Sequence, residues 1–124
     1  MPKILAVEDE KDQLNMLKIF FKGEGWEFAG AGTGEKALKE AAAAKPDVIL
    51  MDVNLPDING FDLCRAMKDD PATAGIPVVL ISGDVRDKDR MIEGLGMGGA
   101  IYLLKPVDLD VLKAKLEALL KLGK

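Results

Sequence analysis

Histidine is absent from this chain of 124 residues, and several kinds of chemistry are absent with it. The imidazole ring is the commonest general base, the usual partner of a serine or cysteine nucleophile, and a frequent zinc ligand. The sequence therefore excludes histidine-based nucleophile pairs and histidine-ligated zinc sites. The chain also cannot carry a phosphohistidine of its own.

Cysteine, long apolar runs and excess basic charge are also scarce. The single Cys64 cannot form an intramolecular disulfide, so we expect a reducing, cytoplasmic setting, and its neighbours Phe61 and Leu63 predict a packed side chain. No apolar run approaches the roughly 20 residues of a membrane span, and no signal peptide is visible, so we expect no membrane insertion. The net charge of -4 argues against direct binding to nucleic acid.

The chain does contain enough apolar material for one core, with 48% hydrophobic residues. Apolar runs predict five strands, and amphipathic segments between them predict five helices. We expect residues 1–124 to form a single domain, since no linker or repeat is visible. The predicted strands are 3–7, 26–31, 47–51, 77–82 and 100–104, and the predicted helices are 11–22, 34–44, 60–69, 86–96 and 108–122.

Strict alternation of strands and helices is typical of a parallel sheet with helices on both faces. Right-handed crossovers leave few topologies, and the one we favour is a doubly wound, flavodoxin-like α/β fold with strand order 2-1-3-4-5. Thr33 and Asp108 stand where N-caps of the second and last helices would fall.

Acidic residues follow two of the predicted strands. Asp52 ends the third apolar run, and Glu8 and Asp9 follow the first. The carboxyl ends of parallel strands meet at one edge of the sheet, where ligands bind in such folds. Three crowded carboxylates repel one another, and a hard cation such as Mg²⁺ relieves that repulsion. The pattern predicts a metal beside Asp52, which could act as a nucleophile.

Two further strands end in polar residues. Ser82 closes the fourth apolar run, and Lys105 and Pro106 follow the fifth. A hydroxyl and an ammonium near a metal-bound carboxylate match the oxygens of a phosphoryl group on that carboxylate.

These residues together resemble the receiver domain of bacterial two-component response regulators, which is a chemotaxis-regulator-like form of the flavodoxin-like fold. The similarity runs from Lys3 to about Leu120, essentially the whole chain. The matching segments are the acidic pair Glu8–Asp9, the stretch from Asp52 to Gly60, Ser82, and the stretch from Tyr102 to Pro106.

The resemblance implies a role for each matching residue. Asp52 would be the phosphoacceptor, with Lys105 pairing with the phosphoryl group. Ser82 would be the switch hydroxyl that bonds the phosphoryl group, and Tyr102 the aromatic that changes rotamer. Mg²⁺ would be held by Asp9 and Asp52, by Glu8 acting through water, and by the backbone carbonyl of Asn54. The Lys105–Pro106 peptide bond would be cis.

The resemblance also implies partners. The phosphoryl donor would be a histidine kinase or a phosphotransfer protein. The downstream protein target would bind the face formed by the fourth helix, the fifth strand and the last helix. A phosphorylation-dependent homodimer could form through the same face. We expect no enzyme activity beyond Mg²⁺-dependent self-phosphorylation and autodephosphorylation at Asp52.

Two alternatives stay open at this point. An aspartate-nucleophile phosphatase would also place an acid after an apolar strand, but it normally has a second aspartate two residues later, where this chain has Asn54. A receiver that serves only for docking, without phosphorylation, is the other alternative.

Overall fold

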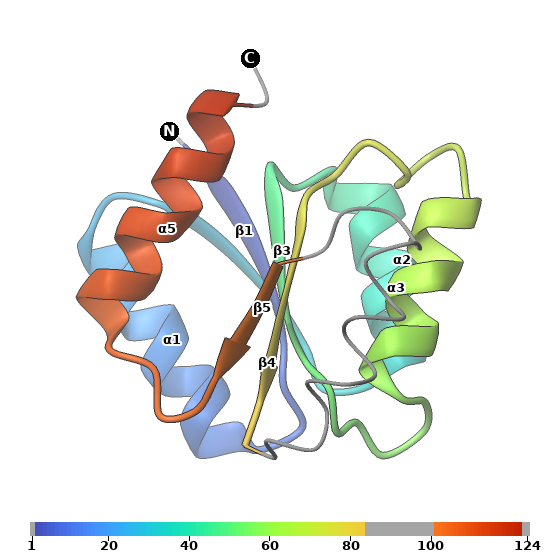
Figure 1. Cartoon of the computed structure of the whole chain (residues 1–124), viewed down its shortest axis with the longest axis horizontal. Coiled ribbons are helices and arrows are strands. Elements are labelled where there is room, and N and C mark those ends of the chain that lie inside the picture. The colour runs from blue at the N-terminus through green and yellow to red at the C-terminus, as the bar shows by residue number, and fades with distance from the viewer. Residues whose placement is uncertain (1, 84–100, 123–124) are drawn as a thin grey trace.

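The computed structural model describes residues 2–83 and 101–122 of the chain. Its centre is a parallel sheet of five strands in the order β2-β1-β3-β4-β5 (Figure 1), which confirms the predicted doubly wound topology. The strands are β1 (Lys3–Val7), β2 (Glu27–Ala31), β3 (Val48–Asp52), β4 (Val78–Ser82) and β5 (Ile101–Leu104).

Four helices lie in the described part of the chain: α1 (Lys11–Gly23), α2 (Gly34–Ala44), α3 (Gly60–Asp69) and α5 (Leu109–Leu122). Each described element begins and ends within one residue of its predicted bounds. The predicted helix 86–96 lies outside the described residues. None of the described helices has the length and apolar character needed to cross a membrane.

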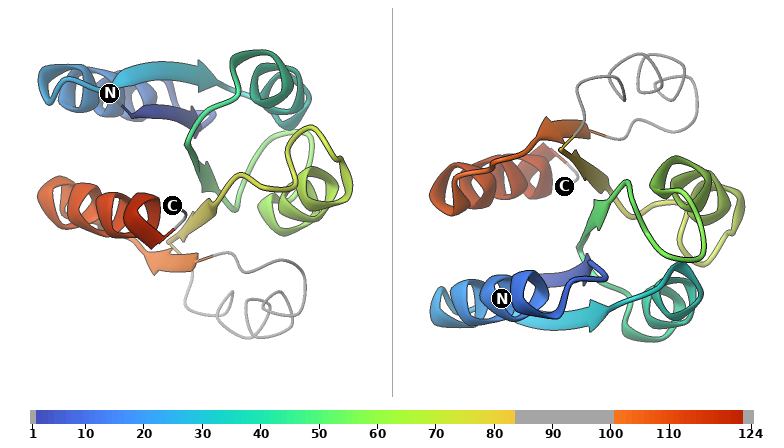
Figure 2. Two further views of the ribbon diagram at one scale, coloured as in Figure 1. Left: turned by 90° about the horizontal axis from the view of Figure 1, so that it is seen from above. Right: turned by 90° about the horizontal axis from the view of Figure 1, so that it is seen from below.

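The helices cover both faces of the sheet (Figure 2), and each face has its own apolar core. Side chains alternate between the two faces of a strand, so neighbours on one strand enter different cores. Leu5 of β1 packs on the side of α2 and α3, whereas Ile4 packs on the side of α1 and α5. The middle strands are buried on both faces, which explains their continuous apolar sequence.

Side-chain caps fix where two helices begin, as predicted. The Thr33 hydroxyl accepts the Lys36 N–H at 3.2 Å at the start of α2. At the start of α5, one Asp108 oxygen accepts the N–H groups of Asp110 and Val111 at 2.9 and 3.2 Å. Such caps satisfy N–H groups that have no partner inside a helix.

Cys64 is buried in the core on the α3 side, which confirms the prediction of packing.

Gly60 allows α3 to begin directly against the end of β3. Its N–H donates to the Val53 carbonyl at 2.7 Å. A Cβ atom at Gly60 would lie 2.7 Å from both the Asp52 carbonyl oxygen and the Val53 Cα. These are backbone atoms, so the clash is relieved only if the loop or the helix shifts.

We therefore expect Gly60→Ala to lower the free energy of unfolding by about 2–3 kcal/mol, since overpacking of this kind strains the backbone. Urea denaturation measures the change. Gly75→Ala is the matched control, because a Cβ atom there meets nothing within 4 Å. Equal midpoints for the two variants would contradict the predicted clash.

Candidate functional site

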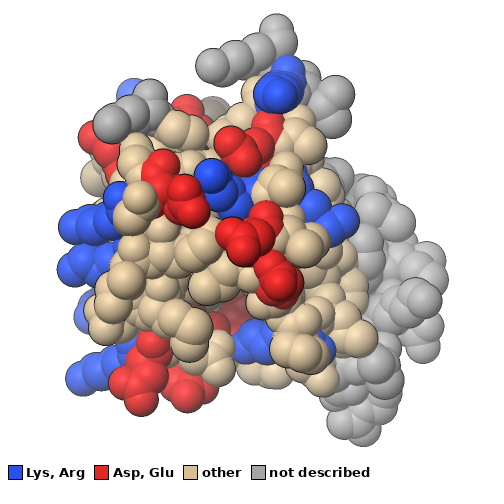
Figure 3. Space-filling view, turned by 90° about the vertical axis from the view of Figure 1, so that its left-hand side faces the viewer, with Lys and Arg blue, Asp and Glu red and all other residues tan. Residues whose placement is uncertain are grey.

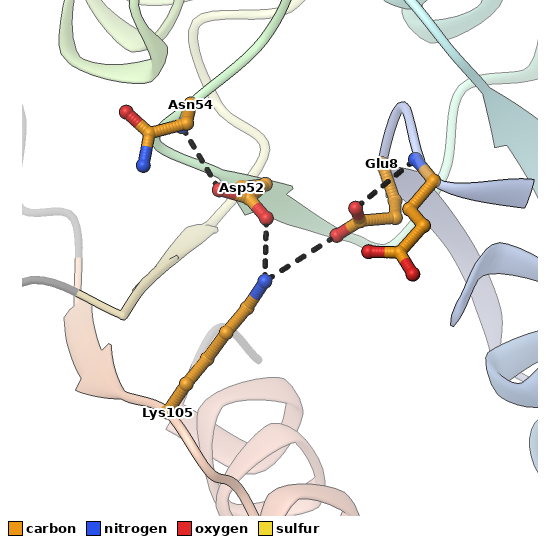
Figure 4. Close-up of polar contacts among 5 residues, drawn as sticks. Glu8, Asp52, Asn54 and Lys105 are labelled. Carbon is orange, nitrogen blue, oxygen red and sulfur yellow. Dashed lines mark hydrogen bonds and ion pairs between the residues drawn. The ribbon is translucent and has the colours of Figure 1, made fainter. Parts of the chain in front are cut away.

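The fold places Asp52 at the carboxyl end of β3, the central strand of the sheet. The residue is 7% exposed, so its charge lies largely out of water. One carboxylate oxygen, Oδ1, accepts the N–H of Asn54 at 2.8 Å. The other oxygen points toward the end of β5 (Figure 4). The carboxylate is thus held in a fixed orientation.

Lys105 approaches Asp52 from the residue after β5 (Figure 4). Its Nζ lies 2.6 Å from Asp52 Oδ2 and 3.7 Å from Glu8 Oε2. Its backbone N–H donates to the Ser82 carbonyl at 2.7 Å. The Lys105–Pro106 peptide bond is cis, as the resemblance implied. The ammonium group therefore connects two acids from two other strands.

Glu8 reaches the same place from the end of β1, with 7% of its surface exposed. Its Oε1 atom accepts the N–H of Glu10 at 3.2 Å. Burial, hydrogen bonding to Asp52 and repulsion from Asp52 together raise the pKa of Glu8 to about 7. Burial alone would lower the pKa of Lys105, but its hydrogen bond to Asp52 and the charges of Asp52 and Glu8 raise it. The site therefore has crowded negative charge that one ammonium offsets only in part.

The raised pKa of Glu8 predicts a pH-dependent stability. Between the ordinary value of 4.5 and about 7, the folded chain binds a proton that the unfolded chain releases. Stability from this group is complete below 4.5 and is lost as the pH rises through 7. In metal-free buffer we expect Glu8 ionisation to lower the free energy of unfolding by about 2–3 kcal/mol.

Urea denaturation of the wild type and Glu8→Gln, from pH 4.5 to 8, measures this contribution. The variant lacks the titrating group, so its stability should exceed that of the wild type increasingly as the pH rises. A constant difference between the two proteins across the range would show that Glu8 titrates normally.

Three of the residues predicted for the site are therefore in contact, namely Asp52, Glu8 and Lys105. Ser82 is fully buried at the end of β4, one residue beyond Ile81, which pairs with Asp52. Tyr102 is partly buried on β5 and packs against the core on the α2–α3 side. Asp9 is exposed in the turn after β1.

The donors around Asp52 suit a hard cation in their chemistry. They are carboxylate and carbonyl oxygens, from Glu8, Asp52, the neighbouring Asp9 and the backbone of Asn54, with no sulfur or imidazole. Burial is the largest cause of the raised pKa of Glu8, and repulsion from Asp52, which a cation would relieve, adds to it. Within residues 2–83 and 101–122, however, no three acids are gathered as a formed metal cage. The donor types fit Mg²⁺, although the described residues do not gather the exposed Asp9 with Glu8 and Asp52.

A cavity of about 530 Å³ opens beside this cluster, between α1 and α5. Glu8 and Lys105 line its inner end, and apolar residues such as Met16, Leu17 and Leu112 line its walls. Figure 3 shows a hollow on this face, rimmed mainly by uncharged residues, with acidic atoms at its floor. The Asp52 cluster can thus be approached from outside on this side.

Sequence reasoning missed one contact at the edge of the site. Asp57, in the loop after Asp52, binds the first backbone N–H groups of α2 through both carboxylate oxygens. The partners are 23 and 22 residues apart, so no local spacing pattern indicates the contact. An aspartate beside Pro56 is typical of any turn, and that was the only available signal.

This fold and an acid–lysine cluster at the carboxyl edge of its sheet are features of flavodoxin-like signalling domains. Comparison with known proteins is more specific. The family model described as the response regulator receiver domain matches residues 4–117. The chain therefore belongs to that family, whose members are signalling domains of two-component systems and work with histidine kinases or phosphotransfer proteins.

Individual relatives agree with this assignment. The chain is 41% identical over 117 residues to the response regulator PleD of Caulobacter vibrioides, covering 94% of this chain and 26% of PleD. It is 34% identical over 119 residues to the DNA-binding response regulator MtrA of Mycobacterium tuberculosis, covering 96% of this chain and 50% of MtrA. The chain thus spans about a quarter to a half of these relatives.

A solved structure shares the fold over its whole length. The receiver domain of the Francisella response regulator 1452 superimposes with a TM-score of 0.88 at 29% identity, covering 100% of both chains.

Proposed function

We propose that this chain accepts a phosphoryl group on Asp52, from a histidine kinase or phosphotransfer protein, and thereby switches a protein-binding surface. One observation carries the proposal: the Lys105 ammonium lies 2.6 Å from a buried carboxylate whose other oxygen is already held by a backbone N–H. Family membership supports the same function. The proposal includes a cytoplasmic location and a single receiver domain over residues 1–124.

In the proposed reaction, a carboxylate oxygen of Asp52 attacks the phosphorus. A new P–O bond forms as the P–N bond to the donor histidine breaks, and the imidazole leaves with the electron pair of that bond. Lys105 neutralises the phosphoryl oxygens during transfer, so the protein mainly positions groups and stabilises charge. Glu8, Asp9, Asp52 and the Asn54 carbonyl would hold Mg²⁺, which neutralises further charge on those oxygens when bound.

The proposed switch starts from contacts around Lys105. A phosphoryl group adds charge approaching -2 beside this ammonium. The Lys105 backbone N–H donates a hydrogen bond to the Ser82 backbone carbonyl, so the ends of β4 and β5 are joined next to Asp52. Ser82, at the end of β4, would hydrogen-bond the phosphoryl group. Tyr102, on the strand β5 that precedes Lys105, would change rotamer.

The surface that changes would be the one formed by the fourth helix, β5 and α5, where a downstream protein or a second copy would bind. The fourth helix lies outside the described residues. Phosphate would later be lost by autodephosphorylation, and we propose no other catalytic activity.

The alternatives are less well supported by the site. A phosphatase of the aspartate-nucleophile kind needs an acid two residues after the nucleophile, and this chain has an exposed Asn54 there. A docking module without phosphorylation would not require the close approach of Lys105 to Asp52.

Intact-mass measurement after incubation with Mg²⁺ and acetyl phosphate tests the proposal. We expect a gain of one phosphate, and no gain when EDTA removes the metal. A parallel incubation with a phosphorylated phosphotransfer domain keeps the test valid if the small donor is too slow. A folded, Mg²⁺-binding protein that gains no phosphate from either donor would favour the docking module.

A further inference from the structure

The loop of residues 53–59 connects Asp52 to α3 and carries Asn54. Its base is closed by three contacts, one from a backbone N–H to the Asp52 carboxylate and two between backbone groups. The Asn54 N–H donates to Asp52, the Gly60 N–H donates to the Val53 carbonyl at 2.7 Å, and Asn54 pairs with Asn59 in an isolated antiparallel bridge. These contacts fix where the loop leaves and re-enters the fold, but none of them holds residues 55–58.

Residues 55–58 are held by the apolar core, against which Leu55 and Ile58 pack, and by a different helix. Asp57 reaches the first turn of α2, where its Oδ1 accepts the Gly34 N–H at 2.8 Å and its Oδ2 accepts the Glu35 N–H at 3.1 Å. Together these N–H groups hold the pKa of Asp57 below its ordinary value, with Gly34 the larger cause. Asp57 is therefore an anion at neutral pH, placed at the positive end of a helix dipole.

Ile58 adds a packing contact beside this one. A Cβ atom at Gly34 would lie 2.1 Å from the Ile58 Cγ2 atom, so Ile58 occupies the space that the absent side chain leaves. Gly34 itself is buried, and Thr33 caps the same helix turn through Lys36. The start of α2 thus has two caps: Thr33 is local to the helix, and Asp57 comes from the loop beside Asp52.

We propose that Asp57 is a positioning residue that holds the loop after Asp52 in the shape the phosphorylation site requires. It acts through Asn54, whose carbonyl would bind Mg²⁺ and whose N–H orients Asp52. The inference rests on the proposed function. Removing a residue that supports a metal ligand without binding the metal itself typically lowers metal affinity or activity by roughly 10-fold.

The two caps of α2 provide a matched pair for the test. Asp57→Ala and Thr33→Ala each remove a side-chain cap from the same helix turn, but only Asp57→Ala releases the loop. Urea midpoints should fall for both variants. Mg²⁺ binding, measured by calorimetry, should weaken roughly 10-fold for Asp57→Ala and less than about 2-fold for Thr33→Ala. Asp57→Asn, which keeps one carbonyl acceptor, should lie between Asp57→Ala and the wild type.

The Mg²⁺ dependence of the phosphorylation rate gives a second readout. The half-saturating Mg²⁺ concentration should rise for Asp57→Ala by the same factor as its dissociation constant. Equal Mg²⁺ affinities for Asp57→Ala and Thr33→Ala, or a wild type that binds no Mg²⁺, would overturn the inference. A wild type that binds Mg²⁺ but takes up no phosphate would instead overturn the proposed function, while the calorimetric comparison would still decide the role of Asp57.

Discussion

Asp52→Asn should abolish the phosphate gain that the wild type shows with Mg²⁺ and acetyl phosphate. Asparagine has nearly the same shape, and its carbonyl oxygen can still accept the Asn54 N–H. It lacks the anionic oxygen that would attack phosphorus, so the expected loss concerns chemistry and not folding. Intact mass measures the gain, and circular dichroism shows that the variant is folded.

The nature of the bond gives an independent check. An aspartyl phosphate is a mixed anhydride, so hydroxylamine should remove the phosphate from the wild type, whereas an ester on Ser82 would survive. Asp62→Asn is the matched control, because Asp62 is an exposed acid in the first turn of α3 and should leave the gain unchanged. A gain that persists in Asp52→Asn would place the phosphate on another residue.

Lys105→Met should slow phosphorylation by at least about 100-fold, the usual cost of removing one group that stabilises developing charge. The Lys105 ammonium lies between Asp52 and Glu8 at 2.6 and 3.7 Å. Its charge lowers the pKa of Glu8, so its removal should raise that pKa further and change the Mg²⁺ dependence of the reaction at neutral pH. Initial rates from intact mass, at several Mg²⁺ concentrations, separate the two effects.

Lys113→Met provides the comparison for this variant. Lys113 forms an ion pair with Glu24 at 3.3 Å, away from Asp52, and surface pairs of this kind contribute little. We expect its phosphorylation rate to match the wild type. If saturating Mg²⁺ restored the full rate to Lys105→Met, Lys105 would act on metal binding alone.

The fold could be predicted from the sequence because its signals are local and repeat. The buried strands read as continuous apolar runs, and Thr33 and Asp108 mark helix starts through contacts within a few residues. The strand order followed from alternation and the handedness of crossovers.

For the site, the sequence predicted which residues take part but not their electrostatic state. Polar residues after strands indicated Glu8, Asp52 and Lys105, and the topology brings these three together. Their electrostatic state was not predictable, because the pKa of Glu8 depends on burial and on its distance from Asp52. The Asp57 contact was missed because it joins segments about 20 residues apart through a side chain that could face solvent in any turn.

The sheet lies between the two apolar cores, and neighbouring residues of a strand contribute to opposite cores. Substitutions that share no partner have additive effects on stability. A change of volume beneath α2 and α3 therefore needs no compensation beneath α1 and α5. Over evolutionary time, one side of the molecule can be reshaped for a new partner while the other keeps its packing. The carboxyl ends of the strands, where Asp52 lies, border both sides of the sheet. Their residues are therefore the ones that can change least.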